Sequence, residues 1–226
     1  MTYIVCVEEN EGRWIAHVPD LPGCYFTHKD REQAIQHIPA EVEAYVGWCR
    51  DHGLRVSGLS EPMIVAEVIR TWESEDGYEV NAFFASDRPP LIEEELPQFE
   101  HLLNATREDL LAVVADLMED SLVREFPNER WSISGILMHV AHADWWYLDR
   151  LGLAFPREEL IDESFSCLEQ VRDFMLATLP ALTKRTGVMT MAGETWAARK
   201  VMRRALWHER DHTEHIRKLR DKLPQW

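Results

Sequence analysis

Two histidines near the C-terminus stand one helical turn apart and are the residues best placed to do chemistry. His208 and His212 lie in a run, residues 196–223, that contains no glycine or proline and is rich in good helix formers. Because an α-helix advances about 100° per residue, both imidazoles point to nearly the same side. Two neutral imidazoles in this arrangement can bind one divalent metal ion. The spacing therefore predicts a metal site on a C-terminal helix.

The same residues also fit the short zinc-protease pattern, because the sequence reads His208-Glu209-x-x-His212. In that pattern Glu209 is the catalytic base. A protease of this type needs a third ligand downstream, and the sequence offers no obvious one. Glu209 is therefore a candidate catalytic residue, while the short pattern alone decides nothing about the reaction.

The third ligand is expected upstream, early in another helix. Ser132 or Ser134 can cap that helix. His139 follows about two turns later, among apolar residues. His142 is nearly one turn further on, and His215 lies two turns after the first histidine of the C-terminal pair. Spacing alone leaves these last two open as alternative ligands.

This arrangement of histidines resembles the DinB/YfiT-like superfamily. The resemblance is carried by His139, which follows a Trp-Ser start and precedes aromatic residues, and by His208 and His212 late in the last helix. It covers roughly residues 93–223. It implies a four-helix bundle in which these three histidines form a metal site. Three nitrogen ligands leave coordination positions open to water or substrate, which is the pattern of catalytic rather than structural sites.

The resemblance also implies a function. Relatives with known activity include thiol-dependent transferases. The first hypothesis is therefore a metal-dependent thiol S-transferase that joins a low-molecular-weight thiol to an electrophile and serves in detoxification or the stress response. The metal can be zinc, nickel or iron, because ligand type does not choose among them. Asp144, Glu209 and Asp211 can orient the ligand imidazoles. Two alternatives stay open: a hydrolase with Glu209 as base, and a non-enzymatic metal-binding or partner-binding protein. A homodimer would fit the habit of the family.

The elements that must position this site begin with an N-terminal region of short strands. Apolar and β-branched runs alternate there with turn residues. A turn at residues 10–12 makes the first two strands a hairpin, and Pro39 should kink or restart the helix that follows. The expected elements are strands at 3–8, 13–18 and 24–27, a helix at 29–52, and strands at 63–72 and 78–85.

Residues 14–24, which read WIAHVPDLPGC, with Ala34 and Ile35 after them, resemble the HicB-like antitoxin domain. The resemblance implies a small α/β module over residues 1–88, made of an antiparallel sheet and a helix. In that family the domain binds a small toxin, so a protein partner of the N-terminal domain is one expectation.

A Pro-rich linker at residues 86–90 precedes the all-α part. The predicted fold class is therefore α+β, with a HicB-like domain at 1–88 and a DinB-like four-helix bundle at 93–226. Residues 187–196 are expected to form an extended turn before the last helix. The four helices are expected at about 97–120, 132–151, 165–182 and 196–223.

Composition excludes several classes of function. The formal charge is −16, and residues 1–95 alone carry 19 acidic and 7 basic side chains, so we expect no nucleic-acid partner. No apolar run approaches the roughly 18–20 residues that cross a membrane, and the N-terminus lacks the pattern of a signal peptide. The four cysteines are scattered, which favours reduced thiols. We therefore expect a cytoplasmic protein that does not contact a membrane.

Overall fold

The computed structural model describes residues 2–58 and 62–223. The chain forms two compact units. The N-terminal unit comprises Met1–Leu91 and Arg185–Arg203, and the C-terminal unit comprises Ile92–Lys184 and Arg204–Trp226. Residues 185–203 therefore group with the N-terminal unit, although they come late in the sequence. The predicted domain boundaries at 88 and 93 stay a prediction.

The N-terminal unit contains a four-stranded sheet in the order β3-β2-β1-β4. Its strands are β1 (Ile4–Asn10), β2 (Arg13–His17), β3 (Tyr25–His28) and β4 (Ile64–Arg70). Strands β1 and β2 pair antiparallel from Cys6 opposite His17 to Asn10 opposite Arg13. The two loop residues, Glu11 and Gly12, both have positive φ, as a tight hairpin turn requires. The predicted hairpin is confirmed.

The prediction of an antiparallel sheet is wrong at one edge, because β4 runs parallel to β1. A hairpin can join only antiparallel strands, whereas parallel neighbours need a longer crossover. Here the chain passes through β2, β3 and helix α1 (Arg31–Asp51) before it returns beside β1. The sheet is therefore mixed, and the unit remains a sheet with one helix.

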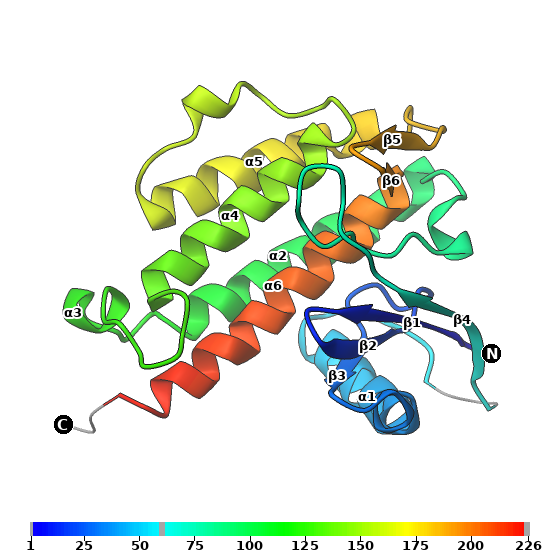
Figure 1. Ribbon diagram of the computed structural model, residues 1–226, viewed down its shortest axis with the longest axis horizontal. Coiled ribbons are helices and arrows are strands. Elements are labelled where there is room, and N and C mark those ends of the chain that lie inside the picture. Colours follow the sequence, from blue (N-terminus) through cyan, green and yellow to red (C-terminus); the bar gives the residue numbers. More distant parts are fainter. Residues whose placement is uncertain (1, 59–61, 224–226) are drawn as a thin grey trace. The chain divides into compact units, whose positions relative to one another are not determined.

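Helix α1 lies against β2 and β3 (Figure 1). Asp30 caps it by accepting a hydrogen bond from the backbone N–H of Gln33 at 2.9 Å. Pro39 lies inside the helix, which continues through it without the predicted restart. The buried face follows a spacing of three and four residues and consists of Ala34, Ile38, Val42, Tyr45 and Cys49.

The predicted strand at 78–85 is absent, apart from an isolated bridge between Glu73 and Glu79. Several backbone N–H groups of this segment bond to carboxylates, whereas the one of Val80 donates to the backbone carbonyl of Trp72. That of Ala82 donates to Glu8 Oε2 at 2.9 Å, and that of Phe84 donates to Asp87 Oδ2 at 3.0 Å. Because these donors are satisfied by side chains, the segment stays buried without joining the sheet.

The remaining elements are mostly helical, and none of the helices in residues 2–58 and 62–223 is long and apolar enough to cross a membrane. Residues 187–196 form a short hairpin, β5–β6, rather than only an extended turn. The elements are η1 (Ala85–Asp87), η2 (Glu93–Glu95), α2 (Leu96–Ala112), α3 (Glu119–Leu122), α4 (Ile133–Asp149), η3 (Arg157–Glu159), α5 (Ser164–Leu182), β5 (Met189–Met191), β6 (Glu194–Trp196) and α6 (Ala198–Arg220).

Helix α2 ends eight residues before the predicted end at 120. The guanidinium of Arg220 donates to the backbone carbonyl of Val113 and forms an ion pair with Asp116 at 2.6 Å. The cation satisfies a carbonyl at the C-terminal end of the helix, where the last carbonyls have no N–H partner within the helix. The chain then turns into the separate short helix α3.

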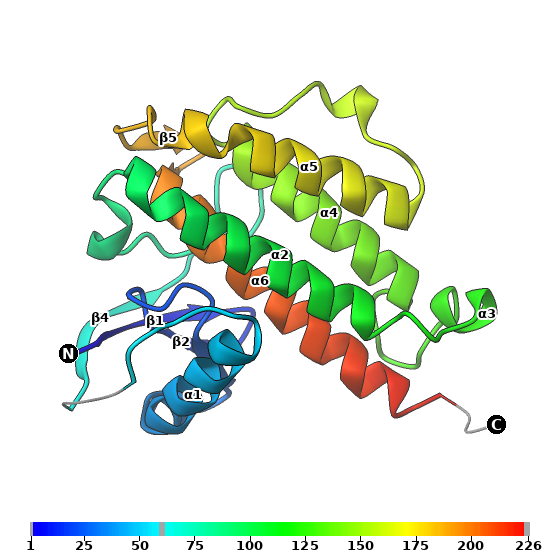
Figure 2. The ribbon, with the colours of Figure 1, turned by 180° about the vertical axis from the view of Figure 1, so that it is seen from behind.

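The core of the C-terminal unit is built by residues from α2, α4, α5 and the second half of α6. Figure 2 shows these four helical segments side by side. Each contributes fully buried apolar side chains, for example Leu110, Leu137, Val171 and Ile216. This packing holds α4 and α6, which carry the candidate ligands, against each other.

Ser132 caps α4 and fixes where that helix begins. Its hydroxyl accepts a hydrogen bond from the N–H of Gly135 at 3.1 Å, whereas Ser134 bonds the hydroxyl of Ser164. We expect Ser132→Ala to lower the free energy of unfolding by about 1 kcal/mol, because one helix-terminal donor loses its acceptor. Urea denaturation measures this, with Ser134→Ala as the matched control. An equal or larger loss in the control would contradict the assignment of the cap.

Candidate metal centre

Three imidazoles from two helices converge in the C-terminal unit. His139 comes from α4, and His208 and His212 come from α6. The Nε2 atom of His208 lies 3.1 Å from Nε2 of His139 and 3.1 Å from Nε2 of His212. One nitrogen from each ring lies within 4.8 Å of the other two. The structure thus brings together the three histidines that the sequence singles out.

The spacing of the nitrogens fits a shared ion better than a chain of hydrogen bonds. An imidazole nitrogen carries either one hydrogen or one in-plane lone pair, so Nε2 of His208 cannot make a normal hydrogen bond to both neighbours. Nitrogens bound tetrahedrally to zinc at roughly 2.0–2.1 Å lie about 3.3–3.4 Å apart, close to the observed 3.1 Å. The cluster is compatible with a divalent metal, and its geometry does not select which one.

His139 is held neutral by its surroundings. Burial lowers its pKa to about 4, with smaller contributions from the charges of Arg130 and His142. Trp131 stacks on the ring of His139 with centroids 4.3 Å apart and an interplanar angle of 20°. The same indole meets His212 edge-on at 6.4 Å. A neutral imidazole with a fixed ring plane offers its nitrogen lone pair in one direction, as a metal ligand must.

The two alternative histidines lie outside this cluster in the described part of the chain. His142 is exposed on α4, and burial followed by the charge of Arg157 lowers its pKa. Nε2 of His215 lies 2.9 Å from Oε2 of Glu129, whose other oxygen, Oε1, accepts a hydrogen bond from Lys222. Glu129 therefore holds His215 on the surface of α6.

Glu209 is fully buried and lies in an ion-pair network. Its carboxylate accepts from Thr106 Oγ1 at 2.5 Å, from Arg107 Nε at 2.5 Å and from Arg172 Nη2 at 2.7 Å. Burial raises the pKa of Glu209, but the charges of Arg107 and Arg172 outweigh it and leave this pKa lowered. A carboxylate with three donors and a lowered pKa is a weak proton acceptor. These contacts favour a structural role for Glu209 over that of a catalytic base.

Asp144 joins the same network from α4. Its Oδ2 atom lies 3.1 Å from Arg172 and 3.7 Å from Arg107, whereas Oδ1 has no hydrogen-bond partner among the described residues. Burial raises the pKa of Asp144 to about 6, against the opposing charge of Arg172. Both carboxylates bond guanidinium groups, so these contacts favour a structural role for Asp144 and Glu209, and their orientation of imidazoles stays a prediction.

Arg107 and Arg172, which connect the helices beside the histidines, were not predicted from the sequence. Arg107 donates to the carbonyl of Leu168 on α5, and Arg172 donates to the carbonyl of Leu103 on α2. Arg107 follows Leu103 by four residues and precedes Leu110 by three, so it interrupts the apolar stripe of α2. A charged residue in a stripe of leucines is the signal that could have indicated a buried ion pair.

Comparison with known proteins identifies relatives of parts of the chain. A family model described as the DinB superfamily matches residues 102–216, which include all three clustered histidines. The UPF0150 protein Ta0767 of Thermoplasma acidophilum is 30% identical over 57 residues, which make up 25% of this chain and 83% of that protein. No solved structure gives a significant match. The predicted HicB-like character of the N-terminal region stays a prediction.

Proposed function

Because the chain belongs to the DinB superfamily, we propose that it is an enzyme that binds one divalent transition metal through His139, His208 and His212. The observation that carries the proposal is the convergence of three Nε2 atoms, with His208 3.1 Å from each of the other two. Three neutral nitrogens with a position left for substrate are typical of catalytic metal sites.

We also propose that α2, α4, α5 and α6 form the four-helix bundle expected of the family. Their shared apolar core supports this arrangement. The ion-pair network supports it too, because its side chains come from all four helices: Arg107 from α2, Asp144 from α4, Arg172 from α5 and Glu209 from α6. Metal sites in such bundles are built from side chains on facing helices.

The reaction that we propose is transfer of a low-molecular-weight thiol to an electrophile. A bound divalent metal supplies Lewis acidity, which lowers the pKa of a thiol. The thiol releases its proton to solvent water, the sulfur of the thiolate bonds to the electrophilic carbon, and the leaving group departs as an anion with the electrons of the broken bond. The chain holds His139 neutral, because burial lowers its pKa to about 4, and the stacked indole of Trp131 fixes the plane of its ring.

Hydrolysis is the weaker proposal for this site. It needs a base for water, and the candidate, Glu209, already accepts three hydrogen bonds inside the protein. A protein partner for the N-terminal unit and a homodimer remain proposals from family resemblance, and neither changes the chemistry of the three-histidine site.

The requirement for thiol separates transfer from hydrolysis. We expect the metal-loaded protein to consume a chromogenic aryl halide only when a thiol such as cysteine or glutathione is added, with a thioether as the product. Mass spectrometry of the product and the rate against thiol concentration measure this. His215→Ala is the matched control and should keep the activity, whereas His139→Ala should lose it. Equal turnover without thiol, giving the hydrolysed product, would contradict transfer.

A further inference from the structure

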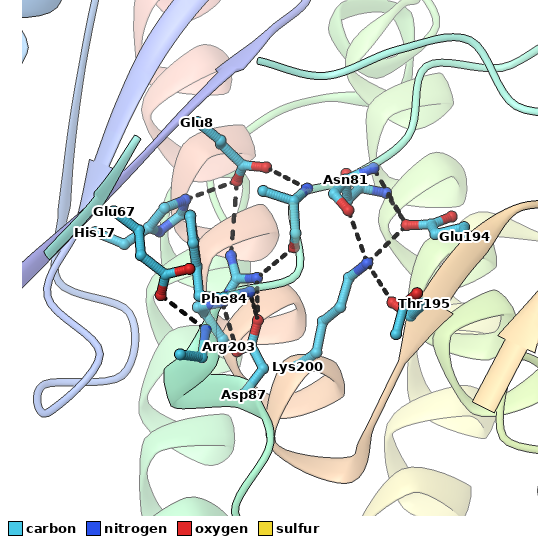
Figure 3. Close-up of polar contacts among 12 residues, drawn as sticks. Glu8, His17, Glu67, Asn81, Phe84, Asp87, Glu194, Thr195, Lys200 and Arg203 are labelled. Atoms are coloured by element: carbon cyan, nitrogen blue, oxygen red, sulfur yellow. Dashed lines mark hydrogen bonds and ion pairs between the residues drawn. The ribbon is translucent and has the colours of Figure 1, made fainter. Parts of the chain in front are cut away.

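Two basic residues in the first turns of α6 are buried deep in the N-terminal unit. The side chain of Lys200 is 0% exposed, and its ammonium group donates to the carboxylate of Glu194 at 2.8 Å. It also donates to the carbonyls of Asn81 at 2.8 Å and Thr195 at 2.9 Å. An ammonium has three N–H donors, and all three are therefore used, as Figure 3 shows. A lysine so fully bonded is a structural anchor rather than a nucleophile.

Arg203, three residues further along α6, is held in the same way. Its guanidinium pairs with both oxygens of Asp87, at 2.9 and 2.8 Å, and donates to the carbonyl of Ala82 at 2.8 Å. It lies over the ring of Phe84 at 4.6 Å and 3.6 Å from the buried carboxylate of Glu8 (Figure 3). A bidentate pair fixes the direction of the guanidinium plane. The side chain of Arg203 is therefore fixed in both position and rotation.

These two anchors share a helix with two of the candidate metal ligands. Helix α6 runs without interruption from Ala198 to Arg220. In an α-helix each N–H bonds the carbonyl four residues earlier, so the turn that carries His208 is built on the turn that contains Arg203 and Arg204. Helix formation is cooperative, and loss of one turn loosens the next.

From these contacts we propose that Lys200 and Arg203 are positioning residues for the metal site. Their buried hydrogen bonds and ion pairs inside the N-terminal unit keep the first turns of α6 helical. Because helix formation is cooperative, the next turn, which carries His208, is then also held helical. The inference rests on the proposed function, because it assigns these residues a role toward the metal ion. It gives the N-terminal unit a part in metal binding without any side chain of its own at the site.

The test compares metal affinity in the full-length chain with and without the anchor. We expect Arg203→Met to raise the dissociation constant for Co²⁺ at least tenfold, which corresponds to about 1.4 kcal/mol. We also expect the d–d absorption of the saturated cobalt complex to change, because less ordered imidazoles alter the ligand geometry. The matched control is Arg217→Met, which removes an exposed arginine paired with Glu214 on the same helix and should leave both values unchanged.

A second variant keeps the inference testable if Arg203→Met does not fold. Asp87→Asn changes a partner that lies outside α6 and keeps its size. We expect Asp87→Asn also to raise the dissociation constant for Co²⁺, but by less than Arg203→Met does. Wild-type affinity and an unchanged cobalt spectrum in both variants would overturn the inference.

Amide hydrogen exchange separates this inference from the proposed function. In metal-free protein we expect the amides of residues 204–212 to exchange at least tenfold faster in Asp87→Asn than in the wild type. If the wild type binds no metal, the proposed function fails, and the exchange rates alone decide whether the anchor orders the helix. Unchanged exchange in these residues would overturn the anchoring role even if metal binds.

Discussion

His208→Ala is expected to weaken zinc binding by more than about 100-fold. The Nε2 atom of His208 lies 3.1 Å from Nε2 of both other candidate ligands. Its removal therefore leaves only two imidazole nitrogens to bind the metal ion. Changes to groups that only orient metal ligands already cost about 10–100-fold in affinity, and a lost ligand should cost more. Competition with a chromophoric chelator measures the dissociation constant.

His215→Ala is the matched control for this experiment. It removes an imidazole from the same helix, but one that pairs with Glu129 instead of joining the cluster. We expect zinc affinity within about twofold of the wild type. Equal weakening in His208→Ala and His215→Ala would show that the histidines bind zinc nonspecifically, and no weakening in either would exclude the three-histidine site.

Glu209→Gln is expected to lower the free energy of unfolding by about 3–5 kcal/mol. Glu209 accepts from Thr106, Arg107 and Arg172 in a fully buried position. The substitution leaves two buried guanidinium groups with one remaining carboxylate, that of Asp144, and removal of one partner from a buried ion pair typically costs this much. Urea denaturation followed by circular dichroism measures the loss.

Asp144→Asn provides the comparison within the same network. Asp144 makes longer contacts than Glu209, at 3.1 and 3.7 Å, and its pKa is raised by burial to about 6. The folded protein therefore gains less from the negative charge of Asp144 than from that of Glu209. We expect a clearly smaller loss of stability than in Glu209→Gln. A larger loss of stability in Asp144→Asn would contradict the conclusion that Glu209 stabilises the network more than Asp144 does.

The candidate ligands could be predicted from sequence because helical periodicity fixes them. His208 and His212 face the same way on any regular helix, and Ser132 sets the start of α4 seven residues before His139. Periodicity places side chains on a face of a helix without reference to the rest of the fold. The packing of α4 against α6, which brings the two groups of histidines together, came from family resemblance.

The buried polar contacts could not be predicted in the same way. Glu209 was expected to serve the metal site because it fits the zinc-protease pattern His208-Glu209-x-x-His212. It lies about 100° from His208 on the helix, however, and bonds Arg107 and Arg172. These partners stand 102 and 37 residues from Glu209 in the sequence. The sequence could indicate that Arg107 is buried, because it interrupts an apolar stripe, but it does not specify which carboxylate the arginine pairs with.

Two predictions for the N-terminal unit are wrong for the same reason, because they also depend on contacts between residues distant in sequence. Strand β4 was expected to pair antiparallel, but the crossover through α1 brings it parallel to β1. Residues 78–85 have the composition of a strand, yet three of their N–H groups bond the carboxylates of Glu8, Asp87 and Glu194. Both outcomes depend on which chain segment lies nearby in space, and strand propensity does not specify it.

The central claim is that His139, His208 and His212 bind one divalent metal ion, and metal content tests it most directly. The full-length chain would be purified without a histidine tag or chelator and analysed by native mass spectrometry and inductively coupled plasma mass spectrometry. The account predicts about one equivalent of zinc, nickel or iron per chain, bound at purification or on addition of the ion. A wild-type chain that carries no metal and takes up none of these three ions would contradict it.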